Sequence, residues 1–292
     1  MKKVLITGSS GQVGTRLTKN LSRAGFEVVG IGSREILDSA NDSNRYIKFD
    51  LLTEDIDSLI EQTRPELLIH LAWETQPNTF WTSPKNVSWL DSSKKLVESF
   101  NKWGGERIVV AGTGAEYDWE SHAPFDELGP EFPKSIYGQT KLALLNVLRH
   151  QATPFLWTRT FFQFGDNETP GRLIPSLIDT LNAGQEFLIQ RPNDIRDFIY
   201  VDDVVQIMTS LVVSEKAGVF NVASGVGITM RELGRKVAGI FERPDLLHFQ
   251  EQSEKPSIVQ ANMAKLEKTL GRITYTNLDE AINKTIRERA KL

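Results

Sequence analysis

A tyrosine, a lysine and a threonine in the middle of the chain have the residue types and spacing for proton transfer. Tyr137 stands four residues before Lys141, so in a helix both side chains lie on one face. A tyrosine titrates near pH ~10 in model peptides, and a neighbouring ammonium group favours the phenolate. We therefore expect Lys141 to lower the pKa of Tyr137 and make it a proton donor or acceptor near neutrality. Thr113 follows an apolar run typical of a strand, where its hydroxyl could hydrogen-bond a substrate carbonyl oxygen.

A glycine-rich turn near the N-terminus suits a dinucleotide. The run 3–7 reads as a buried strand, and the spacing Gly-x-x-Gly-x-x-Gly follows it, ahead of apolar residues at helical intervals. Gly8 would allow a tight turn, Gly11 would admit a pyrophosphate at the helix N-terminus, and Gly14 would let the helix approach the sheet. The predicted binding loop also includes three residues between these glycines, Ser10, Gln12 and Val13.

The end of the next predicted strand, 27–31, bears on the choice of cofactor. An acidic residue there would bind the ribose hydroxyls of NAD, but the chain continues Gly32-Ser33-Arg34. A guanidinium group makes charge-assisted, often bidentate bonds to a phosphate, so Ser33 and Arg34 favour NADP(H). NAD(H) stays open, because Arg34 could instead be a solvated loop residue.

The elements around these residues alternate between strand and helix. The patterns predict strands at 67–71, 107–111 and 155–160 and helices at 86–103 and 137–150. The expected class is therefore α/β, a Rossmann-type doubly wound parallel sheet with a smaller C-terminal substrate-binding lobe. We expect a dinucleotide-binding domain over 1–165, with return segments near 196–224, and a mainly substrate-binding lobe over 166–292.

Composition excludes several classes of function. The net charge is -4 with a pI of about 5.7, which gives no electrostatic basis for binding nucleic acid or an anionic membrane. The chain of 292 residues has no cysteine, and its four histidines are scattered, so we expect no disulfide, thiolate nucleophile or metal site. No apolar run reaches the roughly 20 residues of a membrane span, and no signal peptide is visible. The expected location is the cytoplasm.

These motifs resemble the extended short-chain dehydrogenase/reductases, specifically the NAD-dependent epimerase/dehydratase family that acts on nucleotide sugars. The resemblance covers nearly the whole chain and includes an Arg-Asp-Phe segment at 196–198. It implies that Lys141 also holds the nicotinamide ribose and that the substrate is a nucleotide sugar. It also implies further contacts: Asp50 and Leu51 beside the adenine, Leu71 and Ala72 along the cofactor channel, and Asn86, Arg172 and Arg196 at the substrate, the arginines meeting its diphosphate.

Departures from the family pattern narrow the range of reactions that the chain could catalyse. Thr113 is followed by Gly114-Ala115, where sugar-nucleotide dehydratases have an Asp-Glu pair, and relatives that epimerise and reduce GDP-sugars use a cysteine that this chain lacks. The expected function is an NADPH-dependent reductase of a nucleotide-linked 4-keto-6-deoxyhexose, with Tyr137 as proton donor. A nucleotide-sugar 4-epimerase with retained NAD is the alternative, because Thr113, Tyr137 and Lys141 serve both reactions. A non-catalytic dinucleotide-binding regulator is a second alternative, against which the presence of all three residues argues.

Two further expectations concern surfaces. The segments 73–81 and 116–119 are rich in aromatic residues, which either stack on the base or sugar of the substrate or form buried packing. The resemblance also implies a homodimer, formed through the helices at 86–103 and 137–150.

Overall fold

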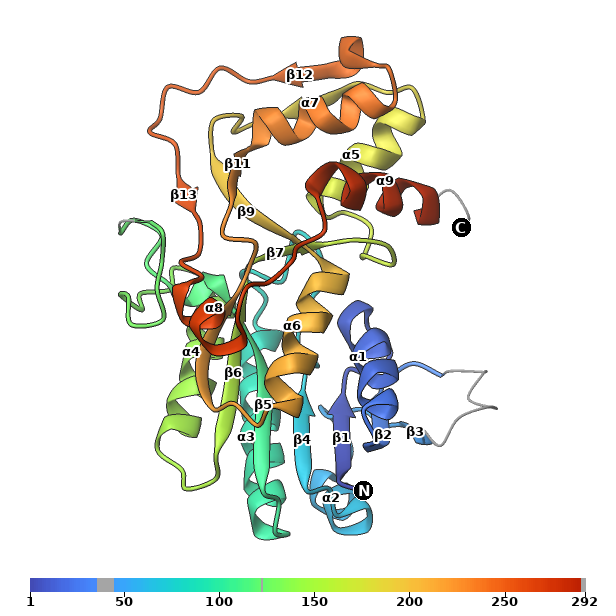
Figure 1. The fold of residues 1–292 in the computed structure, drawn as a ribbon, viewed down its shortest axis with the longest axis vertical. Coiled ribbons are helices and arrows are strands. Elements are labelled where there is room, and N and C mark those ends of the chain that lie inside the picture. Colours follow the sequence, from blue (N-terminus) through green and yellow to red (C-terminus); the bar gives the residue numbers. More distant parts are fainter. Residues whose placement is uncertain (36–44, 122, 290–292) are drawn as a thin grey trace.

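Seven parallel strands form the central sheet, in the order β10-β6-β5-β4-β1-β2-β3 (Figure 1). The structure is a computed structural model, which describes residues 1–35, 45–121 and 123–289. Apart from the edge strand β3, which has no buried residue, the strands are short runs rich in β-branched and other apolar residues that are mostly buried, as a parallel sheet between helices requires. Their bounds are β1 Lys3–Thr7, β2 Glu27–Gly32, β3 Arg45–Lys48, β4 Leu67–His70, β5 Arg107–Thr113, β6 Phe155–Thr160 and β10 Gly218–Val222.

Helices cover both faces of this sheet. On one face, α1 and α6 pack against side chains such as Val4 and Ile6 of β1. On the other, α2, α3 and α4 enclose a second core that includes Leu5 of the same strand. Alternate residues of one strand thus enter opposite cores, which gives the doubly wound arrangement predicted from the sequence. The bounds are α1 Gln12–Arg23, α2 Ile56–Thr63, α3 Lys85–Lys102, α4 Ile136–Arg149 and α6 Val201–Val213.

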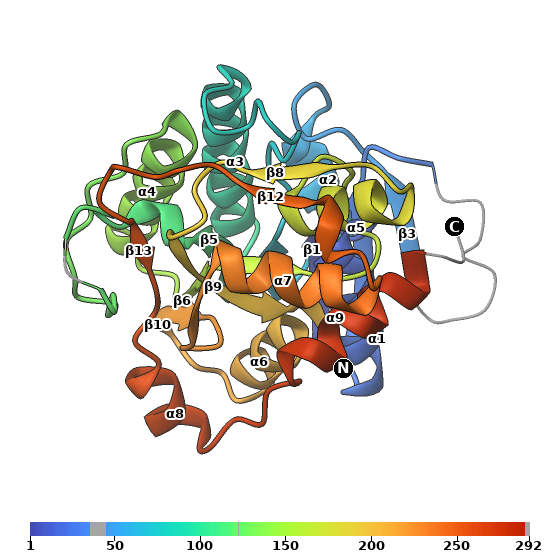
Figure 2. The same ribbon diagram turned by 90° about the horizontal axis from the view of Figure 1, so that it is seen from above.

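A smaller lobe sits above the carboxyl ends of the strands (Figure 1), and α7 lies over the strand ends in the view from above (Figure 2). It contains a four-stranded sheet, in which β9 pairs with β7, β11 and β13, and a two-stranded sheet of β8 and β12. Its strands are β7 Phe162–Phe164, β8 Phe187–Ile189, β9 Ile195–Tyr200, β11 Gly227–Thr229, β12 Leu247–Phe249 and β13 Ile258–Val259, and the remaining helices are α5 Leu173–Asn182, α7 Met230–Ile240, α8 Ala264–Leu270 and α9 Leu278–Arg289.

A buried carboxylate ties the lobe together. Asp197 of β9 accepts hydrogen bonds from the backbone N–H groups of Ser224, Gly225 and Ala261, at 2.9, 3.0 and 3.2 Å. The predicted fold class is confirmed. The domain limits stay a prediction. Among the described residues, no helix is long and apolar enough to cross a membrane.

Candidate active site

A cavity of about 1310 Å³ lies between the carboxyl edge of the sheet and the smaller lobe, and it collects most of the predicted site residues. No three His, Asp or Glu side chains within the described parts of the chain are grouped to hold a metal ion. The predicted residues that line this cavity are Gly8, Ser10, Gly11, Gln12, Val13, Arg34, Leu71, Thr113, Tyr137, Lys141, Arg172 and Arg196.

The glycine loop between β1 and α1 forms a cradle that fits the pyrophosphate of a dinucleotide. Gly8 has a φ of +68°, which L side chains rarely adopt, and a Cβ on Gly14 would lie 2.2 Å from the carbonyl oxygen of Gly8. Gly11 caps α1 without a side-chain hydrogen bond, and the first turn of the helix has no acidic residue. The first N–H groups of α1 are therefore open to an anion, and the helix dipole favours one there.

A cluster of salt bridges to the segment after β7 and to α6 anchors this helix end. Arg16 of α1 pairs with Asp166 at 2.5 Å and with Asp202 at 2.8 Å, and its guanidinium group also donates to the carbonyl oxygen of Gln12. The amide of Gln12 in turn donates to the carbonyl oxygen of Asp166. Sequence reasoning missed Arg16, because its partners lie more than 100 residues away and leave no local pattern.

The rim of the cavity near β2 has the predicted arginine. Arg34 is exposed and lines the cavity, whereas Ser33 is exposed but does not line it. The hydroxyl of Tyr46 donates to the carbonyl oxygens of Gly32 and Arg34 and so braces this turn. Among these residues, only Arg34 brings a positive charge to the cavity.

The three predicted catalytic residues come together from two elements. Thr113 ends β5, and Tyr137 and Lys141 lie in the first turns of α4. Gly138 allows the close approach of these elements, since a Cβ there would lie 2.4 Å from the carbonyl oxygen of Ala115. Tyr137 makes a side-chain hydrogen bond with Thr113.

Burial sets the proton affinities of the pair on α4. It raises the pKa of Tyr137 to about 12, against the hydrogen bond with Thr113, and lowers the pKa of Lys141 to about 7. The ammonium group of Lys141 donates to the carbonyl oxygen of Ala111 at 2.8 Å and lies 3.9 Å from the centre of the Trp73 ring. The pKa of Tyr137 is therefore raised, contrary to the expectation that it would be lowered, because burial outweighs the hydrogen bond with Thr113 and the charge of Arg172.

Aromatic rings form the wall opposite the glycine loop. Phe80 and Trp81 contact the Tyr137 ring edge-on, at centroid distances of 5.1 and 5.7 Å. Trp81 also meets Trp119 edge-on at 5.9 Å, and both indoles line the cavity. Of the two readings of the aromatic segments, Trp81 and Trp119 follow the ligand-facing one, whereas Trp73 is only 7% exposed.

The two predicted substrate arginines lie on this wall. The guanidinium group of Arg172 stacks on Phe80, with its central carbon 4.4 Å from the ring centroid. That of Arg196 lies 5.6 Å from the rings of both Trp119 and Phe162, and Asp194 accepts from it at 3.0 Å. Both cations therefore face the cavity in fixed positions.

Comparison with known proteins identifies the family. The model of the NAD dependent epimerase/dehydratase family matches residues 4–223. The chain belongs to the NAD-dependent epimerase/dehydratase family. Like that family, it is an enzyme, which confirms the resemblance drawn from the motifs.

The relatives of this epimerase/dehydratase family member differ in reaction. It is 26% identical to a UDP-glucose 4-epimerase of Mycolicibacterium smegmatis, an alignment that covers 97% of each chain. It is 25% identical to the dTDP-4-dehydro-6-deoxyglucose reductase of Escherichia coli, over 97% of this chain and 96% of the relative. The fold matches a UDP-glucose 4-epimerase of Thermotoga maritima with a TM-score of 0.87 at 21% identity, over 99% of each chain.

Other residues assigned by the family resemblance lie outside the cavity. Asn86 is fully buried, and its amide is used within the protein: it accepts from the Trp73 indole and donates to the carbonyl oxygens of Phe80 and Ser83. The predicted substrate contact of Asn86 is therefore not supported, and this residue instead braces the 73–86 segment. Sequence reasoning could not see this, because asparagine suits both roles equally.

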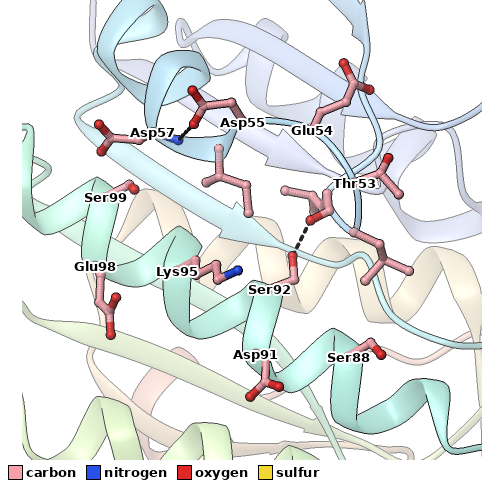
Figure 3. Close-up of a pocket in the computed structure, with 13 residues that line it drawn as sticks. Thr53, Glu54, Asp55, Asp57, Ser88, Asp91, Ser92, Lys95, Glu98 and Ser99 are labelled. Carbon is pink, nitrogen blue, oxygen red and sulfur yellow. Dashed lines mark hydrogen bonds between the residues drawn. The ribbon is translucent and has the colours of Figure 1, made fainter.

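Leu51, expected beside the adenine, borders a different hollow of about 550 Å³ between α2 and α3 (Figure 3). Its carbonyl oxygen accepts from the Ser92 hydroxyl at 2.5 Å. Asp50 accepts from the backbone of Leu52 and lines neither hollow. Ala72 does not line the large cavity but packs on the loop, since its N–H would lie 2.9 Å from a Cβ on Gly8. The cofactor contacts of Asp50, Leu51 and Ala72 stay predictions.

His70 in this family member is a structural residue. Its ring nitrogens hydrogen-bond the hydroxyls of Thr7 and Ser93, each at 2.8 Å. Full burial lowers its pKa to about 3, so the imidazole stays neutral and cannot act as an acid near neutral pH.

Proposed function

We propose that the protein is an NADPH-dependent reductase of a nucleotide-linked 4-keto-6-deoxyhexose. The observation that carries this proposal is the end of β2, where Arg34 reaches the cavity and the positions Ile31-Gly32-Ser33 at the strand end have no acidic side chain. A 2′-phosphate needs a cation at this place, whereas the ribose hydroxyls of NAD are commonly bound by a carboxylate. A reductase consumes its reduced cofactor at every turnover, and NADPH suits that role.

The nicotinamide supplies the hydride when bound, and residues of the chain supply the proton and stabilise the charge. The oxygen of Thr113 accepts the Ala115 N–H at 3.2 Å, so its hydroxyl proton can be donated on the other side, where Thr113 shares a hydrogen bond with Tyr137 and would meet the substrate carbonyl oxygen. Tyr137 gives its proton to the same oxygen. Lys141 places a positive charge beneath this centre and stabilises the phenolate that remains.

The opposite wall supports the choice of substrate. Arg172 and Arg196 offer two cations for a diphosphate, and the rings of Trp81, Trp119 and Phe162 offer an apolar surface between them. A 6-deoxyhexose presents a methyl group and a ring face without a 6-hydroxyl, which suits such a surface. The protein would therefore bind the nucleotide diphosphate through charge and the sugar through contact with the aromatic rings.

A nucleotide-sugar 4-epimerase is the second candidate, because the relatives include UDP-glucose 4-epimerases over nearly the full chain. The two reactions differ in cofactor use, since an epimerase oxidises and re-reduces one carbon and retains its NAD. We further propose a homodimer through α3 and α4, which expose Val87 and Ile136, and a cytoplasmic location. Light scattering of the purified protein tests the dimer.

The discriminating experiment is NADPH absorbance with a panel of nucleotide-linked 4-keto-6-deoxyhexoses, run beside Tyr137→Phe. Stoichiometric NADPH consumption that the variant loses is the expected result. Interconversion of C4 epimers without added cofactor would instead favour the epimerase. Ligand-dependent NADPH binding without turnover, unchanged in Tyr137→Phe, would favour a regulator.

A further inference from the structure

A buried carboxylate lies directly behind Thr113, and the chemistry proposed above does not use it. Glu116 is 0% exposed, and both of its carboxylate oxygens accept hydrogen bonds. Oε1 accepts from the Thr113 backbone N–H at 2.8 Å, Oε2 accepts from Nε of Arg159 at 2.8 Å, and the Trp157 indole reaches both oxygens. We propose that Glu116 is a positioning residue, which holds Thr113 in the orientation that the proposed reductase chemistry requires.

The hydrogen bonds around Thr113 explain how this works. The Thr113 hydroxyl accepts from the N–H of Ala115 while Glu116 accepts from the N–H of Thr113, which makes a capping box around the turn Gly114–Glu116. The two bonds fix the backbone and the hydroxyl oxygen of Thr113 together. Because the hydroxyl oxygen accepts from this turn, its proton is available for the hydrogen bond that Thr113 shares with Tyr137 at the cavity.

The space around the Glu116 carboxylate is tightly filled by neighbouring residues. A Cβ on Gly112 would lie 2.0 Å from the Trp157 indole nitrogen and 2.7 Å from Oε1 of Glu116. Gly112 is therefore needed for Glu116 and Trp157 to meet behind the strand. This accounts for the first glycine of the Gly112-Thr113-Gly114 segment, which the dinucleotide site does not explain.

A network of charged side chains fixes the position of Glu116. Arg159 of β6 also bonds Glu131, and Glu131 pairs with Arg149 of α4 at 2.6 Å. The Arg159 guanidinium stacks over the Tyr117 ring at 4.4 Å. A carboxylate whose partners are themselves fixed cannot move without breaking several bonds, so the network transmits rigidity from α4 and β6 to Thr113.

Glu116 also acts on the reactive pair through its charge. Burial raises the pKa of Glu116 itself, and the charge of Arg159 opposes that change. The Glu116 carboxylate raises the pKa of Lys141 against burial, and it raises the pKa of Tyr137 as well. Among the described residues, the ionisable groups that interact electrostatically with Glu116 are Arg149, Arg159, Tyr117, Tyr137 and Lys141.

The test compares Glu116→Ala with Glu116→Gln in the full chain. Glutamine keeps an oxygen acceptor for the Thr113 N–H but removes the charge, whereas alanine removes both. Because small misplacements of a reacting group cost about a hundredfold in rate, we expect Glu116→Ala to lower kcat about 100-fold with KM changed less than about threefold. For Glu116→Gln we expect less than about a tenfold loss, and a basic limb of the pH–kcat profile moved to lower pH.

Hydrogen exchange of the Thr113 amide gives a readout that needs no substrate. We expect slow exchange in the wild type and in Glu116→Gln and faster exchange in Glu116→Ala. If the wild type reduces none of the sugars, the exchange rates still show whether Glu116 holds Thr113. The positioning role of Glu116 and the proposed reductase function can therefore be refuted independently. Equal exchange in wild type and Glu116→Ala would overturn the inference.

The matched control is Asp203→Asn, at a buried carboxyl on α6 that accepts from Thr276 far from Thr113 in sequence. It should lose stability while kcat and its pH profile stay unchanged. If Glu116→Ala and Glu116→Gln lose thermal stability but keep kcat and its pH profile, as the control should, Glu116 serves the fold alone and the inference is overturned. If Glu116→Ala does not fold, an unshifted pH profile in Glu116→Gln overturns the inference.

Discussion

Replacing Lys141 by methionine should stabilise the fold while it removes activity. Lys141 is 2% exposed, and burial lowers its pKa from 10.5 to about 7. Methionine fills a similar volume without a charge, so it avoids the cost of placing an ammonium group inside the protein. The same substitution deletes the cation that the proposed chemistry needs beside Tyr137.

The sign and size of the effect follow from proton binding. The pKa of Lys141 is lower in the folded than in the unfolded chain, so unfolding takes up a proton between about pH 7 and pH 10.5, and wild-type stability rises with pH across that window. At about 1.4 kcal/mol per pH unit, the penalty below pH 7 is at most about 5 kcal/mol. Leaving the Ala111 carbonyl oxygen without its donor costs about 1–3 kcal/mol, so we expect a net gain of about 2 kcal/mol at pH 6.

Urea unfolding at pH 6, 7.5 and 9 measures this gain. The difference between Lys141→Met and wild type should fall by about 2–3 kcal/mol between pH 6 and pH 9, because the wild type loses its penalty as Lys141 deprotonates. Lys95→Met, at an exposed position of α3, is the control and should change stability little at any pH. A gain that does not depend on pH, or a variant less stable than wild type at pH 6, would refute the reasoning.

Three further predictions concern the cofactor and substrate walls. Arg34→Ala should weaken NADPH binding about 10- to 100-fold and leave NADH binding unchanged in fluorescence titrations, and equal losses would contradict the assignment. Gly14→Ala should abolish dinucleotide binding and cost about 1–3 kcal/mol of stability, whereas Gly239→Ala, with open space around its Cβ, should do neither. Trp119→Ala should raise KM for the sugar about tenfold with little change in kcat, because Arg196 loses its aromatic support, and calorimetry of NADPH binding should show no change.

The sequence predicted the parts of the site that have local patterns. The strand, glycine turn and helix of β1 and α1, and the Tyr137–Lys141 pair on α4, follow from spacing within a few residues. The strand before Thr113 was expected at 107–111 and extends to Thr113 itself. The long elements of the sheet could be predicted because their burial gives them continuous apolar runs.

What the sequence could not predict depends on contacts between distant segments. Glu116 and Arg159 are 43 residues apart, and Arg16 and Asp166 are 150 apart. The reversal in the pKa of Tyr137 has the same origin, because helical spacing shows that a lysine is near but not how deeply both groups are buried. The short strands β11 and β13 of the smaller lobe owe their form to pairing with β9 rather than to their own sequence.

Hydride passes from NADPH to C4 of a nucleotide-linked 4-keto-6-deoxyhexose in the function proposed here, with Tyr137 as proton donor. The most direct test supplies NADPH deuterated at both C4 positions of the nicotinamide and locates the label by NMR of the sugar product. We expect deuterium at C4 of the sugar, one label for each NADPH consumed, and no product from Tyr137→Phe. Product without deuterium, or conversion that proceeds with no NADPH present, would contradict it.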